Sequence, residues 1–133
     1  MKVHIFLPIN KNQASGGGNQ FLLSLREEFR RKGVYSENHT EANVILFNSH
    51  HHLEKINSVR GKKIFHRIDG LHQLWRGNSG LNIDKSIHYF GNKFVNGIIY
   101  QSDWGRLMFK NSGLDINKNY KIIQNAPDNS FFF

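Results

Sequence analysis

The sequence predicts an α/β fold in which a mostly parallel sheet carries helices on both faces. The chain opens with an apolar run at residues 3–7, a turn at Pro8 and three glycines at 16–18, followed at once by apolar residues at helical spacing. Beyond this opening, short apolar runs alternate with amphipathic segments as far as residue 123. Such alternation is typical of parallel strands joined by helical crossovers.

The first half of the chain is predicted to form one long helix and three extended segments. Phe21, Leu22, Leu25 and Phe29 recur at helical spacing, and Lys32-Gly33 ends this helix. We expect a short edge strand at 34–35. Residues 43–47 are almost uniformly apolar, as in a strand buried on both faces. A short helix at about 53–59 then leads to a strand at 63–68.

The second half continues the alternation. Residues 71–83 contain Gly77, Gly80 and several Asn and Ser, and predict a long loop. A helix from about Asp84 to Phe94 follows, and then a strand at 97–101. Ser102 or Asp103 is expected to cap a helix that runs to about 111–113, and residues 120–123 predict the last strand.

Composition narrows the classes of function. The 133 residues suit one domain, with 38% hydrophobic and 21% charged residues, no cysteine and no apolar run of membrane-spanning length. The start shows no hydrophobic signal core, so we expect a cytoplasmic protein, with peripheral contact at an anionic membrane left open. The net charge of +8 favours anionic partners. The basic residues are dispersed and nucleic-acid-binding motifs are missing, so nucleic acid is not expected.

Polar residues follow the predicted strands where ligands of open α/β sheets bind. Five segments meet this description: residues 8–18, 48–52, 69–76 and 101–103, together with Asn125. Gly16, Gly17 and Gly18 precede a helix N-terminus, where backbone N–H groups favour phosphate; a plain flexible loop is the alternative. The sequence therefore points to a ligand with phosphate groups at this edge.

Three segments resemble the N-terminal domain of family 4 retaining glycosyltransferases, enzymes of the two-domain GT-B architecture. They are residues 66–77 (HRIDGLHQLWRG), 96–104 (NGIIYQSDW) and 122–128 (IIQNAPD). The resemblance implies a Rossmann-like three-layer α/β/α domain over residues 1–125 and the start of an interdomain linker at 126–133. Asn96-Gly97 stands where the family commonly has Ala-Asp.

The resemblance implies an enzyme that transfers a sugar from a nucleotide-sugar donor to a sugar or other hydroxyl acceptor, with retention. This chain would be the acceptor-binding half, inactive alone, because the family's C-terminal domain supplies most donor contacts. That donor-binding domain, or a separate donor-binding subunit, is the implied partner. No cofactor or obligatory metal is implied. The alternatives are a non-catalytic Rossmann-like binding module and one subunit of a split transferase.

Candidate site residues follow from both lines of reasoning. Asp69 ends a strand before a glycine and is expected to orient or deprotonate an acceptor hydroxyl, or else to cap its loop. The candidates for binding the acceptor are His66, Arg76, Trp75, His52 and Asn48. The candidates for lining the cleft are Gln101, Ser102 and Arg106. Each of three candidates has a simpler interpretation: Ser102 as an N-cap, Trp75 as a packing residue and His66 as a structural histidine. His50-His51-His52 lacks the ligand spacing of a zinc site, so no metal is expected.

Overall fold

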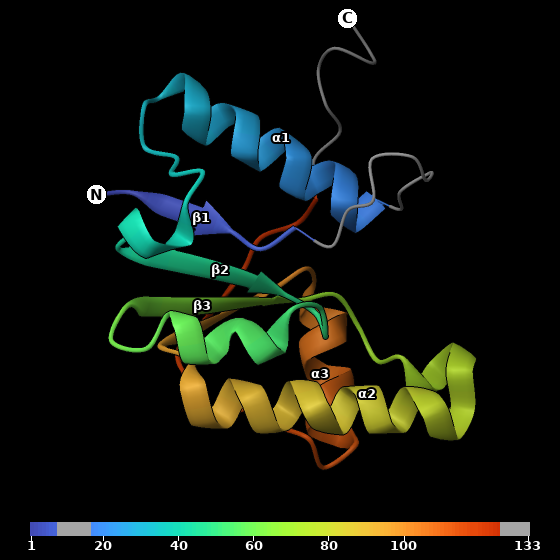
Figure 1. The fold of residues 1–133 in the computed structure, drawn as a ribbon. Helices are drawn as coiled ribbons and strands as arrows, with labels where there is room; N and C mark the ends of the chain where they lie inside the picture. The colour runs from blue at the N-terminus through green and yellow to red at the C-terminus, as the bar shows by residue number, and fades with distance from the viewer. Residues whose placement is uncertain (8–16, 126–133) are drawn as a thin grey trace, which may run out of the picture.

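A computed structural model describes residues 1–7 and 17–125, which form an all-parallel sheet with helices on both faces (Figure 1). The five strands lie in the order β1-β2-β3-β4-β5. Their bounds are β1 Val3–Ile5, β2 Val44–Asn48, β3 Lys63–Ile68, β4 Gly97–Tyr100 and β5 Tyr120–Ile122. The predicted fold class is confirmed, and β3 has the predicted bounds.

A short segment extends the sheet beyond β1. Tyr35 forms a parallel bridge with Val3, whose N–H donates to the Val34 carbonyl and whose carbonyl accepts from Ser36 N–H, each at 2.8 Å. The chain thus leaves β1 to one side and returns on the other side at β2. This reversal is a topological switch point, and ligands of open α/β sheets bind at the carboxyl ends of the strands beside such a point.

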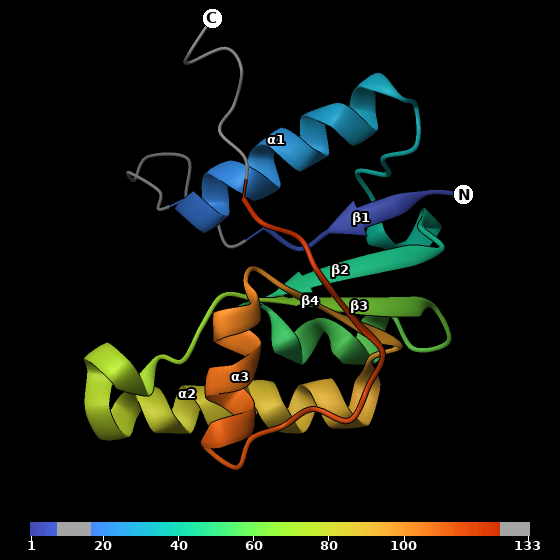
Figure 2. The same cartoon turned by 180° about the vertical axis from the view of Figure 1, so that it is seen from behind.

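The two faces of the sheet are covered by different helices (Figures 1 and 2). Helix α1, Gly17–Arg31, lies on one face and buries Leu22 against Ile5 and Leu46. The opposite face packs against the 3₁₀ helix η2, Leu53–Ser58, and helices α2, Gln73–Phe94, and α3, Asp103–Asn111. A second 3₁₀ helix, η1, spans His39–Glu41.

The larger hydrophobic core lies beneath η2, α2 and α3. Alternate residues of β2 and β3 point into it, with Phe47 and Ile64 among them, and Phe90 and Phe109 meet them from the helices. This period of two explains why strands between helical layers read as continuous apolar runs. Helix α1 begins at Gly17, so Gly17 and Gly18 belong to its first turn, whereas Gly16 lies outside the described residues.

The predicted loop at 71–83 is wrong, because helix α2 already begins at Gln73. The helix is kinked at Gly77, where φ is 58° and ψ is −133°. Asp84, predicted as the start of the helix, is instead fully buried inside it. Its carboxylate accepts the backbone N–H groups of His72 at 2.8 Å and Gln73 at 3.0 Å. A side chain far along the sequence therefore satisfies the first turn's free donors.

None of the helices among the described residues is long and apolar enough to cross a membrane.

The kink in α2 requires a glycine at position 80. A Cβ added to Gly80 would lie 2.4 Å from the backbone carbon and oxygen of His72. We predict that Gly80→Ala lowers the free energy of unfolding by about 2 kcal/mol or more, since backbone atoms cannot yield to this overlap. Gly70→Ala is the control, because a Cβ there meets nothing within 4 Å. Equal urea midpoints for the two variants would contradict the packing described.

Candidate functional site

The carboxyl edge of the sheet brings together polar segments that are far apart in the sequence. Asn48 ends β2 and residues 49–52 follow it, residues 69–72 follow β3, Gln101 and Ser102 follow β4, and Asn125 lies beyond β5. The structure thus places these segments at the carboxyl ends of neighbouring strands. The predicted residues at 8–16 lie outside the described part of the chain.

Arg67 connects the strand ends. Its side chain is fully buried, and its guanidinium donates to Asn48 Oδ1 at 2.8 Å, to Asn125 Oδ1 at 2.7 Å and to Asp69 Oδ1. It also lies over the ring of Phe21 on α1, 4.9 Å from the ring centroid. A buried charge is tolerated only when it is paired and hydrogen-bonded in this way. One side chain thus links β2, β3, the segment after β5 and α1.

Asp69 is held at this edge with part of its side chain open to solvent. Arg67 binds its Oδ1, while the side chain as a whole is 36% exposed. The Asp69 backbone oxygen lies 3.0 Å from the place where Gly105 would carry a Cβ, so the first turn of α3 packs directly on this loop. A carboxylate has several lone pairs, so an oriented Asp69 can accept a further hydrogen bond.

Two predicted acceptor-binding residues are structural instead. His66 is fully buried, where its Nε2 lies 2.6 Å from the Ser49 carbonyl oxygen and its ring packs on Phe90. Asn48 is also buried, and its oxygen accepts from Arg67. Both predictions are therefore corrected, because burial keeps these side chains from contacting an acceptor. Both side chains instead stabilise the carboxyl edge from within the protein core.

The three consecutive histidines do not point together. Ser49 and His52 adopt positive φ values of 54° and 59°, which turn the chain sharply after β2. The rings of His50 and His51 pack 4.2 Å apart, whereas His52 turns toward β1, with its Nε2 3.0 Å from the Leu7 carbonyl oxygen. No group of three metal-ligating side chains converges anywhere in residues 1–7 and 17–125.

A third imidazole completes a cluster across the two loops. His72 lies 5.1 Å from His50 between ring centroids and places Nδ1 3.2 Å from Asp84 Oδ1. We call His50, His51 and His72 the histidine cluster. The same Asp84 carboxylate caps α2, so the fold of the helix also positions this ring. His72 and Asp84 were not among the predicted site residues.

Two rings of the histidine cluster, His50 and His51, are kept neutral by lowered pKa values. Burial, together with the nearby His51, His72 and Arg76, lowers the pKa of His50 to about 4, and Asp69 opposes this shift. Burial also lowers the pKa of His51, again with Arg76 and Asp69 acting on it in opposite directions. At neutral pH these rings therefore offer hydrogen-bonding nitrogens without a charge.

The exposed rim of the cluster comes from the first turn of α2. Trp75 is 65% exposed, and its ring lies 6.1 Å from that of His72. Arg76 is exposed too, and its N–H donates to the His72 carbonyl oxygen at 2.9 Å. Three predicted site residues, Asp69, Trp75 and Arg76, therefore lie around the histidine cluster, which does not include the predicted His52.

The residues after β4 have mainly structural roles. Ser102 Oγ accepts the Gly105 N–H at 3.0 Å, which confirms the N-cap interpretation. Gln101 donates its backbone N–H to the Ile68 carbonyl at 3.2 Å and keeps a half-buried side chain. Arg106 pairs with Asp103 at 2.9 Å and lies over Tyr120. Its guanidinium is thus directed to Tyr120 of β5.

The neutral histidines predict a specific response to acid. The unfolded chain protonates His50 near pH 6.5, whereas the folded protein does so near pH 4. Between these values the unfolded state binds more protons, so the free energy of unfolding should fall as pH falls from about 6.5 toward 4. His50→Gln should make this decline shallower, since Gln does not titrate. Part of the decline should remain in this variant, because burial also lowers the pKa of His66 to about 4.

Ring-proton NMR checks this assignment residue by residue. His50 and His66 should keep the chemical shifts of neutral imidazole at pH 5.5 and change only near about pH 4. A His50 midpoint close to that of a free imidazole would contradict its burial in the cluster.

Comparison with known proteins finds no counterpart. No protein-family model matches the chain, and neither a curated protein nor a solved structure matches it. The function is therefore inferred from the carboxyl edge and from the sequence motifs that lie on it.

Proposed function

We propose that this chain is the acceptor-binding half of a retaining glycosyltransferase that uses a nucleotide-sugar donor. The observation that carries the proposal is the arrangement at the carboxyl edge. There, a solvent-accessible carboxylate held by a buried arginine lies in the same neighbourhood as neutral imidazoles and an exposed tryptophan. The motif resemblance at residues 66–77 and 96–104 covers the same edge.

These side chains suit a carbohydrate hydroxyl acceptor. Asp69 accepts a hydrogen bond from the attacking hydroxyl, and Arg67 fixes the direction of that carboxylate. His50 and His51 supply nitrogens that donate or accept without placing a charge beside the sugar. Trp75 offers an exposed aromatic face to the apolar side of a sugar ring. Arg76 adds a cation for phosphate or another anionic group.

In this proposal the donor binds on the α1 side of the same edge. Gly17 and Gly18 form the first turn of α1, which follows β1 at the topological switch point. Helix N-termini there present free N–H groups and a positive dipole end to phosphate. A donor-binding domain or subunit supplies the remaining nucleotide contacts. In a retaining reaction the chain then acts by positioning the hydroxyl against the sugar and excluding water.

Glycan binding is the direct test. We predict that methyl glycosides and disaccharides of common hexoses and uronic acids shift the amide signals of residues 49–52 and 69–76 in ¹⁵N NMR. Trp75→Ala should lower the affinity about tenfold, because the stacking surface is lost. Tyr89→Ala on the same helix is the matched control, since Tyr89 is 57% exposed but lies far along α2 from Trp75. Chemical-shift changes confined to other segments would contradict this location of the binding site.

An assay of sugar transfer distinguishes the proposed enzyme from the alternative, a non-catalytic binding module. With its donor-binding domain or subunit present, Asp69→Asn should lower turnover by roughly 10²-fold because the acceptor hydroxyl loses its oriented partner. The far-UV spectrum should stay unchanged, as Asn keeps an oxygen for Arg67. Glycan binding without any transfer would favour the non-catalytic module. An unchanged rate in the variant would remove Asp69 from the mechanism.

A further inference from the structure

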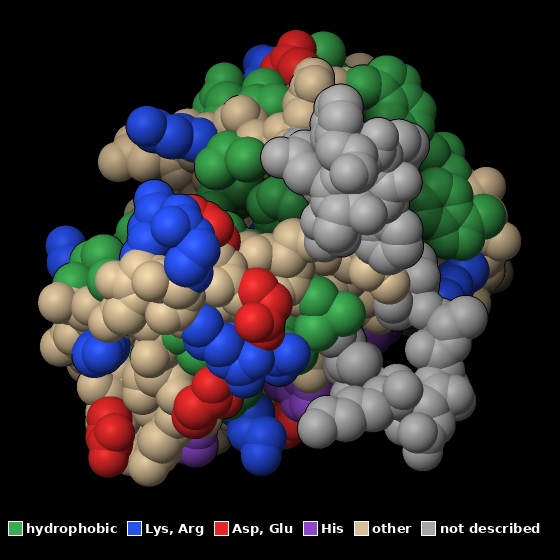
Figure 3. All heavy atoms as spheres, turned by 90° about the horizontal axis from the view of Figure 1, so that it is seen from above, with side chains coloured by type: hydrophobic (Ala, Val, Ile, Leu, Met, Phe, Trp, Pro, Cys, Tyr) green, Lys and Arg blue, Asp and Glu red, His purple; other side chains and the backbone are tan. Residues whose placement is uncertain are grey.

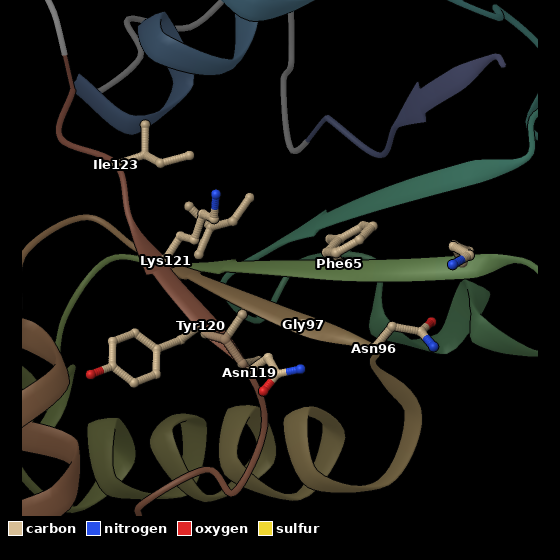
Figure 4. A pocket seen from close by; sticks show the side chains of 10 residues that line it. Phe65, Asn96, Gly97, Asn119, Tyr120, Lys121 and Ile123 are labelled. Atoms are coloured by element: carbon tan, nitrogen blue, oxygen red, sulfur yellow. The ribbon is translucent and has the colours of Figure 1, made fainter.

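The α1 face of the sheet is covered only in part. Helix α1 packs on β1 and β2, and its Phe21 reaches Arg67 of β3, but within the described part of the chain no helix lies over β4 and β5 on that side (Figures 1 and 2). Strand register places Phe65 beside Gly97, and Ile99 beside Lys121, on this face. Figure 4 shows Phe65, Lys121 and Ile123 pointing toward the same open side. We call this area the β3–β5 face.

The β3–β5 face continues into a hollow beside α1. A cavity of about 240 Å³ lies between Phe21, Leu25 and Phe29 of α1 and the sheet residues Phe65 and Ile99. A shallower groove of about 410 Å³ extends from it across β4 and β5. Ile123 lines both, and it is 43% exposed. The two hollows thus form one continuous apolar surface that a protruding side chain can enter.

Glycine 97 keeps this surface flat. A Cβ at that position would lie 3.1 Å from the Phe65 ring, so any larger residue would displace the ring. Parallel sheets bury both faces, and the elements that cover them are helices whose apolar stripe lies on the strands. The missing cover for the β3–β5 face is therefore a helix.

The charges beside the groove indicate what kind of helix fits. Lys63 and Lys121 line it and are exposed, and no acidic side chain lines it. Figure 3 views the molecule from the α1 side and shows Lys and Arg side chains among hydrophobic ones, with Asp and Glu side chains beside several of them. We propose that the β3–β5 face docks an amphipathic helix from a protein partner, with Asp or Glu flanking its apolar stripe. This inference does not depend on the proposed sugar transfer.

Designed peptides test the complementarity of charge. The probe is a fluorescent, stapled helix of about 18 residues with Leu at i, i+3, i+4 and i+7 spacing and Glu beside the stripe. Its control carries Lys in place of every Glu. The full chain should bind the Glu peptide at least about tenfold more tightly than the Lys peptide, and added salt should reduce the difference. Equal affinities, or no binding of the Glu peptide, would overturn the proposal.

Charge reversal locates the binding surface. Lys63→Glu with Lys121→Glu should weaken the Glu peptide about tenfold or more, since both rim charges become repulsive. Lys85→Glu with Lys110→Glu is the matched control on α2 and α3, where both lysines are exposed, and should bind like the original protein. Equal weakening by the two double variants would overturn the location.

Two other occupants of the β3–β5 face would give different experimental results. One result in sedimentation would be dimers that form with rising concentration and that disappear in the Lys63→Glu, Lys121→Glu double variant. That result would assign the face to a second copy of the chain. Binding of the Glu peptide that emerges only after removal of residues 126–133 would assign it to the chain's own C-terminal segment. Either result would contradict docking of a partner helix.

Discussion

The buried guanidinium of Arg67 is the constraint on which the carboxyl edge depends. Its hydrogen bonds reach Asn48 after the apolar part of β2, Asp69 after β3 and Asn125 beyond β5, and Phe21 of α1 covers its plane. A charge so deeply buried is stable only if these partners stay in place. The energetic requirement of one side chain thereby fixes the relative positions of strand ends that carry the candidate site.

A second buried polar group organises the loop that faces this edge. Asp84 binds two backbone N–H groups at the start of α2 and approaches the ring of His72. The kink at Gly77 and the close packing of Gly80 let the helix fold back onto that carboxylate. Trp75 and Arg76 are consequently presented on a helical turn beside His72. A rigid rim of this kind suits a site that must position a hydroxyl group.

Local patterns predicted the sheet well and the polar network poorly. The strand at 63–68 and the cap at Ser102 follow from apolar runs and from a local side-chain hydrogen bond, so they were predictable. Arg67 joins a residue 58 positions away, which no local pattern reports. The same is true of Asp84, whose partners lie 11 and 12 residues earlier. An arginine inside an apolar strand was the one available signal of this network. The neighbouring His66 was instead predicted to bind an acceptor, because it lies close to Asp69 in the sequence.

Hydrogen exchange on Arg67→Met tests most directly whether this arginine holds the edge together. The account predicts faster exchange of the amides of Ser49, which donates to the Arg67 carbonyl oxygen at 2.8 Å, and Gln101, which donates to that of Ile68 at 3.2 Å. Protection at Ile45 and Ile64, near the opposite ends of their strands, should remain. Arg31→Met, which removes an exposed ion pair with Glu28, is the control. Uniform loss of protection, or none, would contradict a local clamp.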